Sequence, residues 1–130
     1  MKFLQPEGWM PPKGYSNGVS ATGRQIFVSG MVGWDAAGQF HTDDFAGQVR
    51  QALQNVVTVL QEGGAKPEHI VRMTWYVVNK AEYVSSYAEI GKAYREIIGR
   101  HFPAMSAVQV LALVEDRAKV EIEVTAVVPE

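Results

Sequence analysis

The clearest hydrophobic pattern of the chain lies near its C-terminus, over residues 120–126. Apolar and polar residues alternate there without exception: Val120, Ile122, Val124 and Ala126 against Lys119, Glu121, Glu123 and Thr125. A two-residue period predicts a strand with one buried face. Two carboxylates then point the same way, roughly 7 Å apart at about 3.3 Å of rise per residue. This pattern fits either a solvated strand face or a carboxylate that lines a pocket and moves a proton, and periodicity does not decide between them.

A second segment of strand character, residues 103–108, precedes this one. The polar residues Glu115, Asp116 and Arg117 lie between the two segments. Two strands separated by a polar turn favour a hairpin or a short connection between paired strands. We therefore expect the last two strands to be neighbours in the sheet.

Two helices are predicted by apolar residues that recur every three or four positions. The first begins at a cap provided by Thr42 or Asp43, runs to about Glu62 and stops at Gly63-Gly64. The second begins at a cap provided by Asn79 and continues as one helix to Gly99. The apolar positions are Phe45, Val49, Leu53, Val56 and Leu60 in the first helix, and Tyr83, Tyr87, Ile90, Tyr94 and Ile97 in the second.

The rest of the chain supplies strands and loops. Residues 1–14 predict an irregular lead-in, residues 15–21 and 25–29 an N-terminal hairpin, residues 30–38 a glycine-rich loop, and residues 70–78 a central strand. The element order β-β-α-β-α-β-β indicates an α+β fold with one mixed sheet and both helices on one face. The central strand is apolar on both sides, which points to a partner subunit on the second face of the sheet.

Composition narrows the possible classes of function. A chain of 130 residues predicts one domain, residues 1–130, and its net charge is −2 with Lys and Arg scattered singly. We expect no nucleic-acid partner, because no basic cluster is visible, and no membrane span or secretion signal, so the cytoplasm is the default compartment. There is no cysteine. The glycine loop lacks dinucleotide-binding spacing, and no metal or cofactor site is expected.

The positions of the histidines and serines do not favour a metal site or a serine triad. His41 stands beside Asp43 and Asp44, which has the appearance of a metal cluster, but two acids at a helix start are better explained as capping groups. No nucleophile elbow is present, so nothing in the sequence supports a serine triad.

The two C-terminal strands carry motifs that point to a known family. Pro103-Ala104-x-Ser106-x-Val108 followed by Val120-Glu121-Ile122-Glu123 resembles the C-terminal signature of the RidA/YjgF family, and Tyr15 and Val28-Ser29-Gly30 agree with it. The resemblance extends from about residue 15 to residue 127. It implies a chorismate-mutase-like fold, a homotrimer whose sheets form a central barrel, and three ligand clefts between subunits.

The resemblance also implies an activity and a set of site residues. Active members of the family hydrolyse imines and enamines to 2-oxo acids and ammonia. An arginine after Pro-Ala holds the substrate carboxylate, and a glutamate on the last strand holds the water. In this chain the glutamate is Glu121, while Tyr15 and the segment Ser29-Gly30 complete the site.

The arginine position is the departure that matters most, because it is Met105 in this chain. Methionine has a thioether where arginine has a planar fork of donors. We expect capture of a small 2-imino acid to weaken by at least tenfold and up to about a thousandfold. Arg100 and Arg117 are close in sequence but stand at the ends of elements. The family often has cysteine at the position of Ala107 and asparagine at that of Gly91.

Two hypotheses follow, together with a weaker third. The first is a deaminase-like hydrolase of altered specificity, in which Glu121 holds water beside an apolar cleft lined by Met105 and Ala107, with Met31 and Trp34 from the glycine loop. Such a cleft suits a neutral, cationic or aromatic ligand better than a small acid. The second is a non-catalytic member that binds a metabolite or a partner protein. Some family members are labelled endoribonucleases or translation inhibitors, a function that the acidic balance of this chain opposes.

Overall fold

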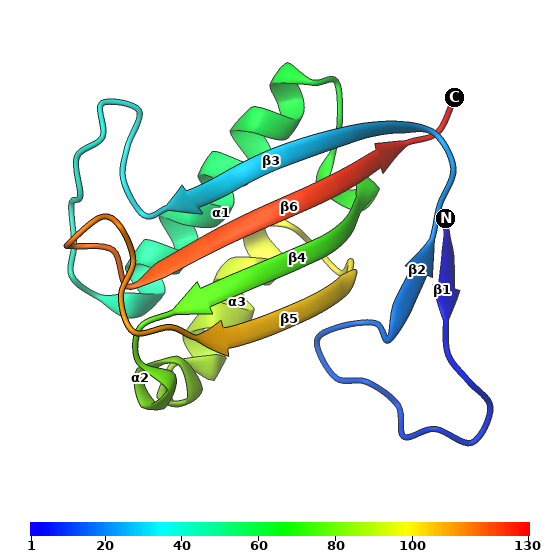
Figure 1. The fold of residues 1–130 in the computed structure, drawn as a ribbon, viewed down its shortest axis with the longest axis horizontal. Coiled ribbons are helices and arrows are strands. Elements are labelled where there is room, and N and C mark those ends of the chain that lie inside the picture. The colour runs from blue at the N-terminus through cyan, green and yellow to red at the C-terminus, as the bar shows by residue number, and fades with distance from the viewer.

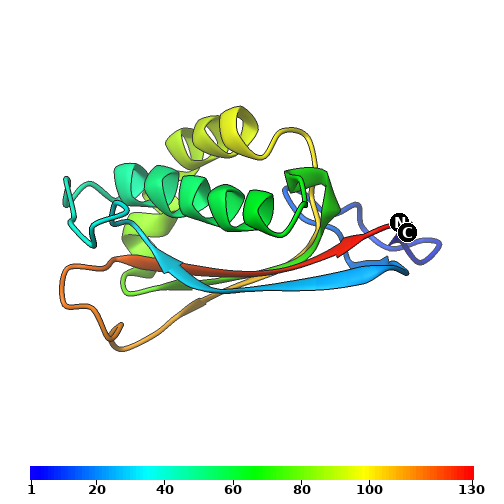
Figure 2. The same cartoon turned by 90° about the horizontal axis from the view of Figure 1, so that it is seen from above.

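A four-stranded sheet covered by helices on one face forms the body of the protein. The computed structural model describes residues 1–130, and its sheet has the strand order β3-β6-β4-β5 (Figure 1). Seen from the side, the helices lie in one layer above the sheet and no helix lies below it (Figure 2). The strands are β1 (Lys2–Leu4), β2 (Gly18–Ser20), β3 (Arg24–Val32), β4 (Ile70–Val77), β5 (Ala104–Gln109) and β6 (Val120–Val128). The helices are α1 (Phe45–Glu62), a single 3-10 turn η1 (Pro67–His69), α2 (Lys80–Ser85) and α3 (Tyr87–Ile97). The α+β class with one mixed sheet is as predicted.

The last two strands are not neighbours, and the hairpin prediction for them was wrong. Strand β5 lies parallel to β4, whereas β6 lies antiparallel to both β3 and β4. The helices connect β4 to β5 as a parallel crossover, so β5 takes the place on one side of β4. Residues 110–119 are long enough to carry the chain past β4, and β6 then occupies its other side.

The N-terminal hairpin was also predicted wrongly, because β2 pairs with β1 and not with β3. The lead-in therefore contains a strand, where the sequence predicted none. After β2 the chain turns at Gly23, where an added Cβ would lie 2.1 Å from the carbonyl oxygen of Val128. The backbone of Gly23 thus lies close to the end of β6, and β3 begins there by pairing with β6 and not with β2. Before β2, Ser16 lies beside the start of β5, because its N–H donates to the carbonyl oxygen of Pro103 at 3.0 Å.

Strand β3 extends through Val32, so Gly30 and Met31 belong to a strand and not to the predicted loop. Its pairing with β6 shifts register between Val28 and Met31. Such a shift is a β-bulge, which bends a strand and changes the direction of nearby side chains. The bulge lies at Ser29 and Gly30.

The helix caps differ in detail from the predictions. The N-cap of α1 is Asp44, whose carboxylate accepts from the N–H of Gly47 at 2.9 Å, and not Thr42 or Asp43. Asn79 caps α2 as predicted, by accepting from the N–H of Glu82 at 3.0 Å. The predicted second helix is interrupted at Ser86 and continues as α3.

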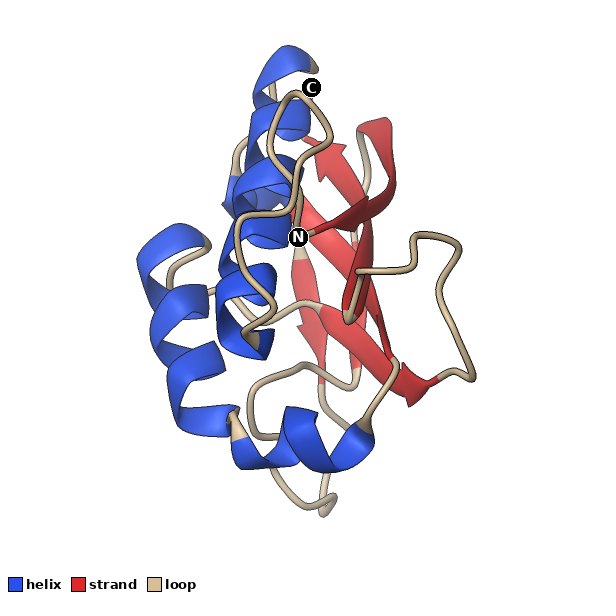
Figure 3. Ribbon diagram, turned by 90° about the vertical axis from the view of Figure 1, so that its left-hand side faces the viewer, coloured by secondary structure: helices blue, strands red, loops and turns tan.

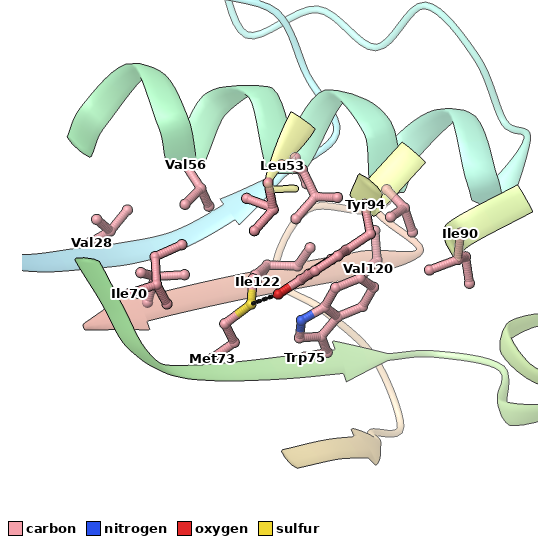
Figure 4. Packing of buried hydrophobic residues seen from close by; sticks show 14 of the residues in the cluster. Val28, Leu53, Val56, Ile70, Met73, Trp75, Ile90, Tyr94, Val120 and Ile122 are labelled. Carbon is pink, nitrogen blue, oxygen red and sulfur yellow. Dashed lines mark hydrogen bonds between the residues drawn. The ribbon is translucent and has the colours of Figure 1, made fainter. Parts of the chain in front are cut away.

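The hydrophobic core lies between α1, α3 and the sheet (Figure 4). The predicted apolar stripe of α1 is buried, with Val49, Leu53, Val56 and Leu60 fully excluded from solvent. Strand β6 alternates as predicted, its apolar side chains buried and its polar ones partly exposed. Gln48 is the one fully buried polar side chain, and it bonds to residues 42, 117 and 119.

The second face of the sheet has no helix on it (Figure 3). Phe27 is 71% exposed there, and the hydroxyl of Tyr76 donates to Glu123 at 2.7 Å. No helix in the structure combines the length and the apolar character that a membrane crossing requires.

Candidate functional site

Glu121 lies on the uncovered face of the sheet, beside the bulge in β3. An ideal Cβ added to Gly30 would lie 2.4 Å from its Oε2 and 2.5 Å from its carboxyl carbon. The φ angle of Gly30 is not in the left-handed region, so space and not backbone conformation requires glycine here. Glycine at a strand position allows another group to approach the backbone closely. The bulge therefore provides room for the carboxylate of Glu121.

A second carboxylate on the same face is engaged by a tyrosine. The hydrogen bond to Glu123 is the largest of the effects that raise the pKa of Tyr76, with burial and the charges of Glu123 and Glu121 adding to it. Glu123 thus accepts a bond within the chain, whereas Glu121 makes no side-chain hydrogen bond. Glu121 is the carboxylate that remains available to a ligand or a water.

A groove lies on the other side of the sheet, between β5, the N-terminal segment and the helices. It has a volume of about 900 Å³. Of the residues expected to bind substrate, Tyr15, Met105 and Ala107 line it. Met105 also packs against the hydrophobic core. The remaining walls are mainly aromatic or aliphatic: Trp75, Val77, Tyr83, Val84, Tyr87, Ile90, Tyr94, Phe102 and Val108.

The charges of this groove differ from the expectation of an apolar cleft with one carboxylate. Its charged residues are Lys13, Lys80 and Arg95, and no Asp or Glu lines it. The guanidinium of Arg95 lies over Gly91, because an ideal Cβ at Gly91 would be 3.2 Å from its Nη1. The groove is therefore basic, and an arginine is present in it although position 105 is methionine.

The expected site residues lie on opposite faces of the sheet within one chain. Met105 is paired with Met73 and faces the helices, whereas Glu121 alternates with the buried Val120 and Ile122 and faces away from them. Ser29 lies on the same uncovered face, in a hollow of about 420 Å³ beside Phe27, Arg72, Thr74, Glu123 and Thr125. A single chain does not bring Glu121 and Met105 together.

Two further expected residues do not line the groove. Met31 packs against the core. Trp34 forms an isolated bridge with Phe40, their rings 5.8 Å apart, and its carbonyl oxygen accepts from Asn55 at 2.7 Å. These contacts hold the loop after β3 against α1. In one chain, neither side chain meets Met105 or Ala107.

The acids near His41 have other partners. His41 Nε2 lies 2.6 Å from Asp35, Asp43 pairs with Arg117 at 2.9 Å, and Asp44 caps α1. The hydrogen bonds from the backbone of Gln39 and from His41 lower the pKa of Asp35. This cluster closes the loop between β3 and α1.

Sequence reasoning missed Arg95 and the aromatic walls as groove residues. The tyrosines were identified, but only as the apolar stripe of one helix. The interruption at Ser86 separates Tyr83 from Tyr94, and both line the groove. One feature of the sequence could have indicated Arg95: it stands one helical turn after Gly91, the position where the family often has asparagine.

Comparison with known proteins identifies the family. The family described as Endoribonuclease L-PSP matches residues 9–128. The chain is 32% identical over 116 residues to the 2-iminobutanoate/2-iminopropanoate deaminase of Salmonella typhimurium, covering 87% of this chain and 86% of that protein. The human protein of the same name is 29% identical over 105 residues, covering 80% and 73%.

Solved structures agree with this assignment. A Yersinia pestis protein of unknown function, YyfB of the conserved Rid family, superposes with a TM-score of 0.87 at 32% identity, covering 98% of both chains. Escherichia coli TdcF with bound serine superposes with a TM-score of 0.69 at 27% identity, covering 98% of this chain and 99% of that one. Sequence and fold together establish that the chain belongs to the Endoribonuclease L-PSP family, the family of the RidA/YjgF proteins.

Proposed function

We propose that the protein is a deaminase-like hydrolase of imines, with its sites in clefts between copies of the chain. One observation carries the proposal: an unpartnered carboxylate, Glu121, is held beside a bulge whose glycine leaves space for it. Relatives of known name support the reaction class, because they are called 2-iminobutanoate/2-iminopropanoate deaminases.

The chemistry requires a water and one group that moves a proton. Glu121 accepts a proton from water as the oxygen adds to the imine carbon, which breaks the C=N π bond, and it passes this proton to the nitrogen to give a carbinolamine. The carboxylate then takes the hydroxyl proton of the carbinolamine and passes it to the nitrogen as the C=O bond forms. The C–N bond breaks and ammonia leaves, so imine and water become a carbonyl compound and ammonia. One correctly placed carboxylate serves both steps as general base and general acid.

The proposed site takes its two halves from neighbouring copies. Strands β3 and β5 are the two edges of the sheet. Gly30 lies on β3 and Glu121 on the adjacent strand β6, whereas Met105 and Ala107 lie on β5. Edge strands have unpaired backbone groups that favour pairing with another chain. Contact between the β3 side of one copy and the β5 side of the next is head-to-tail, the kind of contact that gives a ring when the rotation between copies closes, as in the homotrimer expected from the resemblance.

Met105 makes small 2-imino acids poor substrates in this proposal. A fixed guanidinium at this position makes a two-point contact with a carboxylate, and a thioether does not. The groove is large and mainly aromatic, which favours an imine with a bulky apolar body over 2-iminobutanoate. Three basic residues and no acid line the groove, so a cationic ligand is disfavoured.

Hydrolysis of two imines above the spontaneous rate tests the proposal. Both substrates are generated in situ by an amino-acid oxidase, 2-iminobutanoate from 2-aminobutanoate and 2-imino-3-phenylpropanoate from phenylalanine. Wild type should accelerate the aromatic imine and leave the small one near background, while Met105→Arg should gain at least tenfold on the small one.

Glu121→Gln is the matched variant for catalysis, because it keeps shape and removes the base. It should abolish turnover and leave the fold and the assembly intact. Wild-type turnover of 2-iminobutanoate as fast as that of Met105→Arg would contradict the specificity claim. Absence of turnover on both imines would favour a non-catalytic binding protein.

A further inference from the structure

We propose that Arg95 is the anion-binding residue of the groove, and that the ligand is an aromatic carboxylate whose acid group reaches α3. This inference rests on the groove of the proposed function and names its substrate class. It places the positive charge on the helix wall, opposite the strand position held by Met105.

Arg95 is free to bind an external anion. Its side chain makes no hydrogen bond and no salt bridge within the chain, whereas the neighbouring Glu96 pairs with Arg50 at 2.7 Å. Side chains on a helix lean toward its N-terminus, which directs Arg95 over the preceding turn. Gly91 stands at that place and contributes no side chain, so the guanidinium lies in space that any other residue would share. The position of the Arg95 guanidinium therefore depends on the absence of a side chain at position 91.

The walls of the groove match a planar apolar body. Tyr83 contacts both Trp75 and Tyr87 with ring centroids 6.2 Å and 5.2 Å apart, and Tyr94 stacks on Phe102 at 5.7 Å. Aromatic rings favour edge and offset contacts with a further ring.

The charge of the groove selects a carboxylate. Lys13, Lys80 and Arg95 are its charged residues, and no acid opposes them. Of the three, only arginine has the planar pair of donors that fits two carboxylate oxygens. Arg95 and Met105 belong to different walls, α3 and β5. A ligand that fills the groove and reaches Arg95 therefore has a longer body than 2-iminobutanoate.

Calorimetric binding of two matched probes tests the inference. 3-Phenylpropanoate and 3-phenylpropanamide share one body and differ only in charge. Wild type should bind the acid more tightly than the amide. Arg95→Gln should weaken binding of the acid by about tenfold. This is the lower end of the effect of losing a charge-assisted hydrogen bond, because Arg95 is exposed. Binding of the amide should change less than twofold. Arg100→Gln removes the same charge from an exposed residue outside the groove and should change neither.

A second variant tests the position of the guanidinium. Gly91→Glu places an acid one turn before Arg95, the favourable orientation for an ion pair on a helix, and should weaken the acid probe as Arg95→Gln does. Gly91→Gln has the same size without the charge and should weaken it less. Both substitutions replace a helical glycine and so preserve folding.

The outcomes separate this inference from the proposed function. Unchanged binding of the acid by Arg95→Gln, or equal binding of acid and amide by wild type, overturns the role of Arg95 even if imine turnover depends on Glu121. Charge-dependent binding that requires Arg95 supports it, even if no imine is hydrolysed.

Discussion

Replacement of Gln48 by leucine should destabilise the protein by about 2 kcal/mol, through loss of three hydrogen bonds. Gln48 is fully buried on α1; its Nε2 donates to the carbonyl oxygens of Thr42 and Arg117 at 3.1 and 3.0 Å, and its Oε1 accepts from the N–H of Lys119 at 2.8 Å. At about 1 kcal/mol each, the three bonds contribute roughly 3 kcal/mol, and burial of the leucine returns about 1 kcal/mol.

Urea unfolding measures this loss. With a slope near 2 kcal/mol per M, the midpoint should fall by about 1 M without a change in slope. Gln54→Leu is the matched control, since Gln54 lies exposed on the same helix, and its effect should stay within about 0.5 kcal/mol. If Gln48→Leu unfolds at the same urea concentration as Gln54→Leu, the side chain does not tie α1 to the start of β6 and the reasoning is wrong.

Two further predictions concern the site and the core. Gly30→Ala should move the carboxylate of Glu121 by about 1 Å and lower imine turnover roughly a hundredfold with little change in circular dichroism; turnover like wild type would contradict the close approach at the bulge. Burial raises the pKa of Tyr94, so above about pH 10 the unfolded chain loses a proton that the folded chain keeps, and stability should fall as pH rises. Tyr94→Phe should flatten that decline in urea midpoints measured between about pH 9 and pH 11, and an equally steep decline in the variant would assign it to other groups.

Local structure was predictable wherever one face of an element is buried. The alternation around Ile122 and the stripe of Leu53 on α1 follow directly from burial on one side, and both were correct. Strand neighbours were not predictable in the same way, because pairing depends on where distant segments pack. The connection after β5 was interpreted as a turn, although it carries the chain past β4 to the other side of the sheet.

The site was predictable only where a motif fixed the residue. Tyr15, Met105 and Ala107, which the family signature grouped, line one groove, and Met105 and Ala107 share a face of β5. The basic character of the groove was missed because Arg95 comes from α3, and a helical arginine is usually a solvent-exposed residue. Its conformation depends on the absence of a side chain at Gly91, a relation that the structure reveals and hydrophobic periodicity does not.

Subunit mixing shows whether each proposed site joins the carboxylate of one copy to the groove of another. Glu121→Gln and Ala107→Trp, the second chosen to fill the groove, should each be inactive on 2-imino-3-phenylpropanoate. In oligomers mixed randomly from equal amounts, about a quarter of the sites combine two intact halves, so we expect about a quarter of wild-type turnover. Turnover that remains at the level of either variant alone would contradict it.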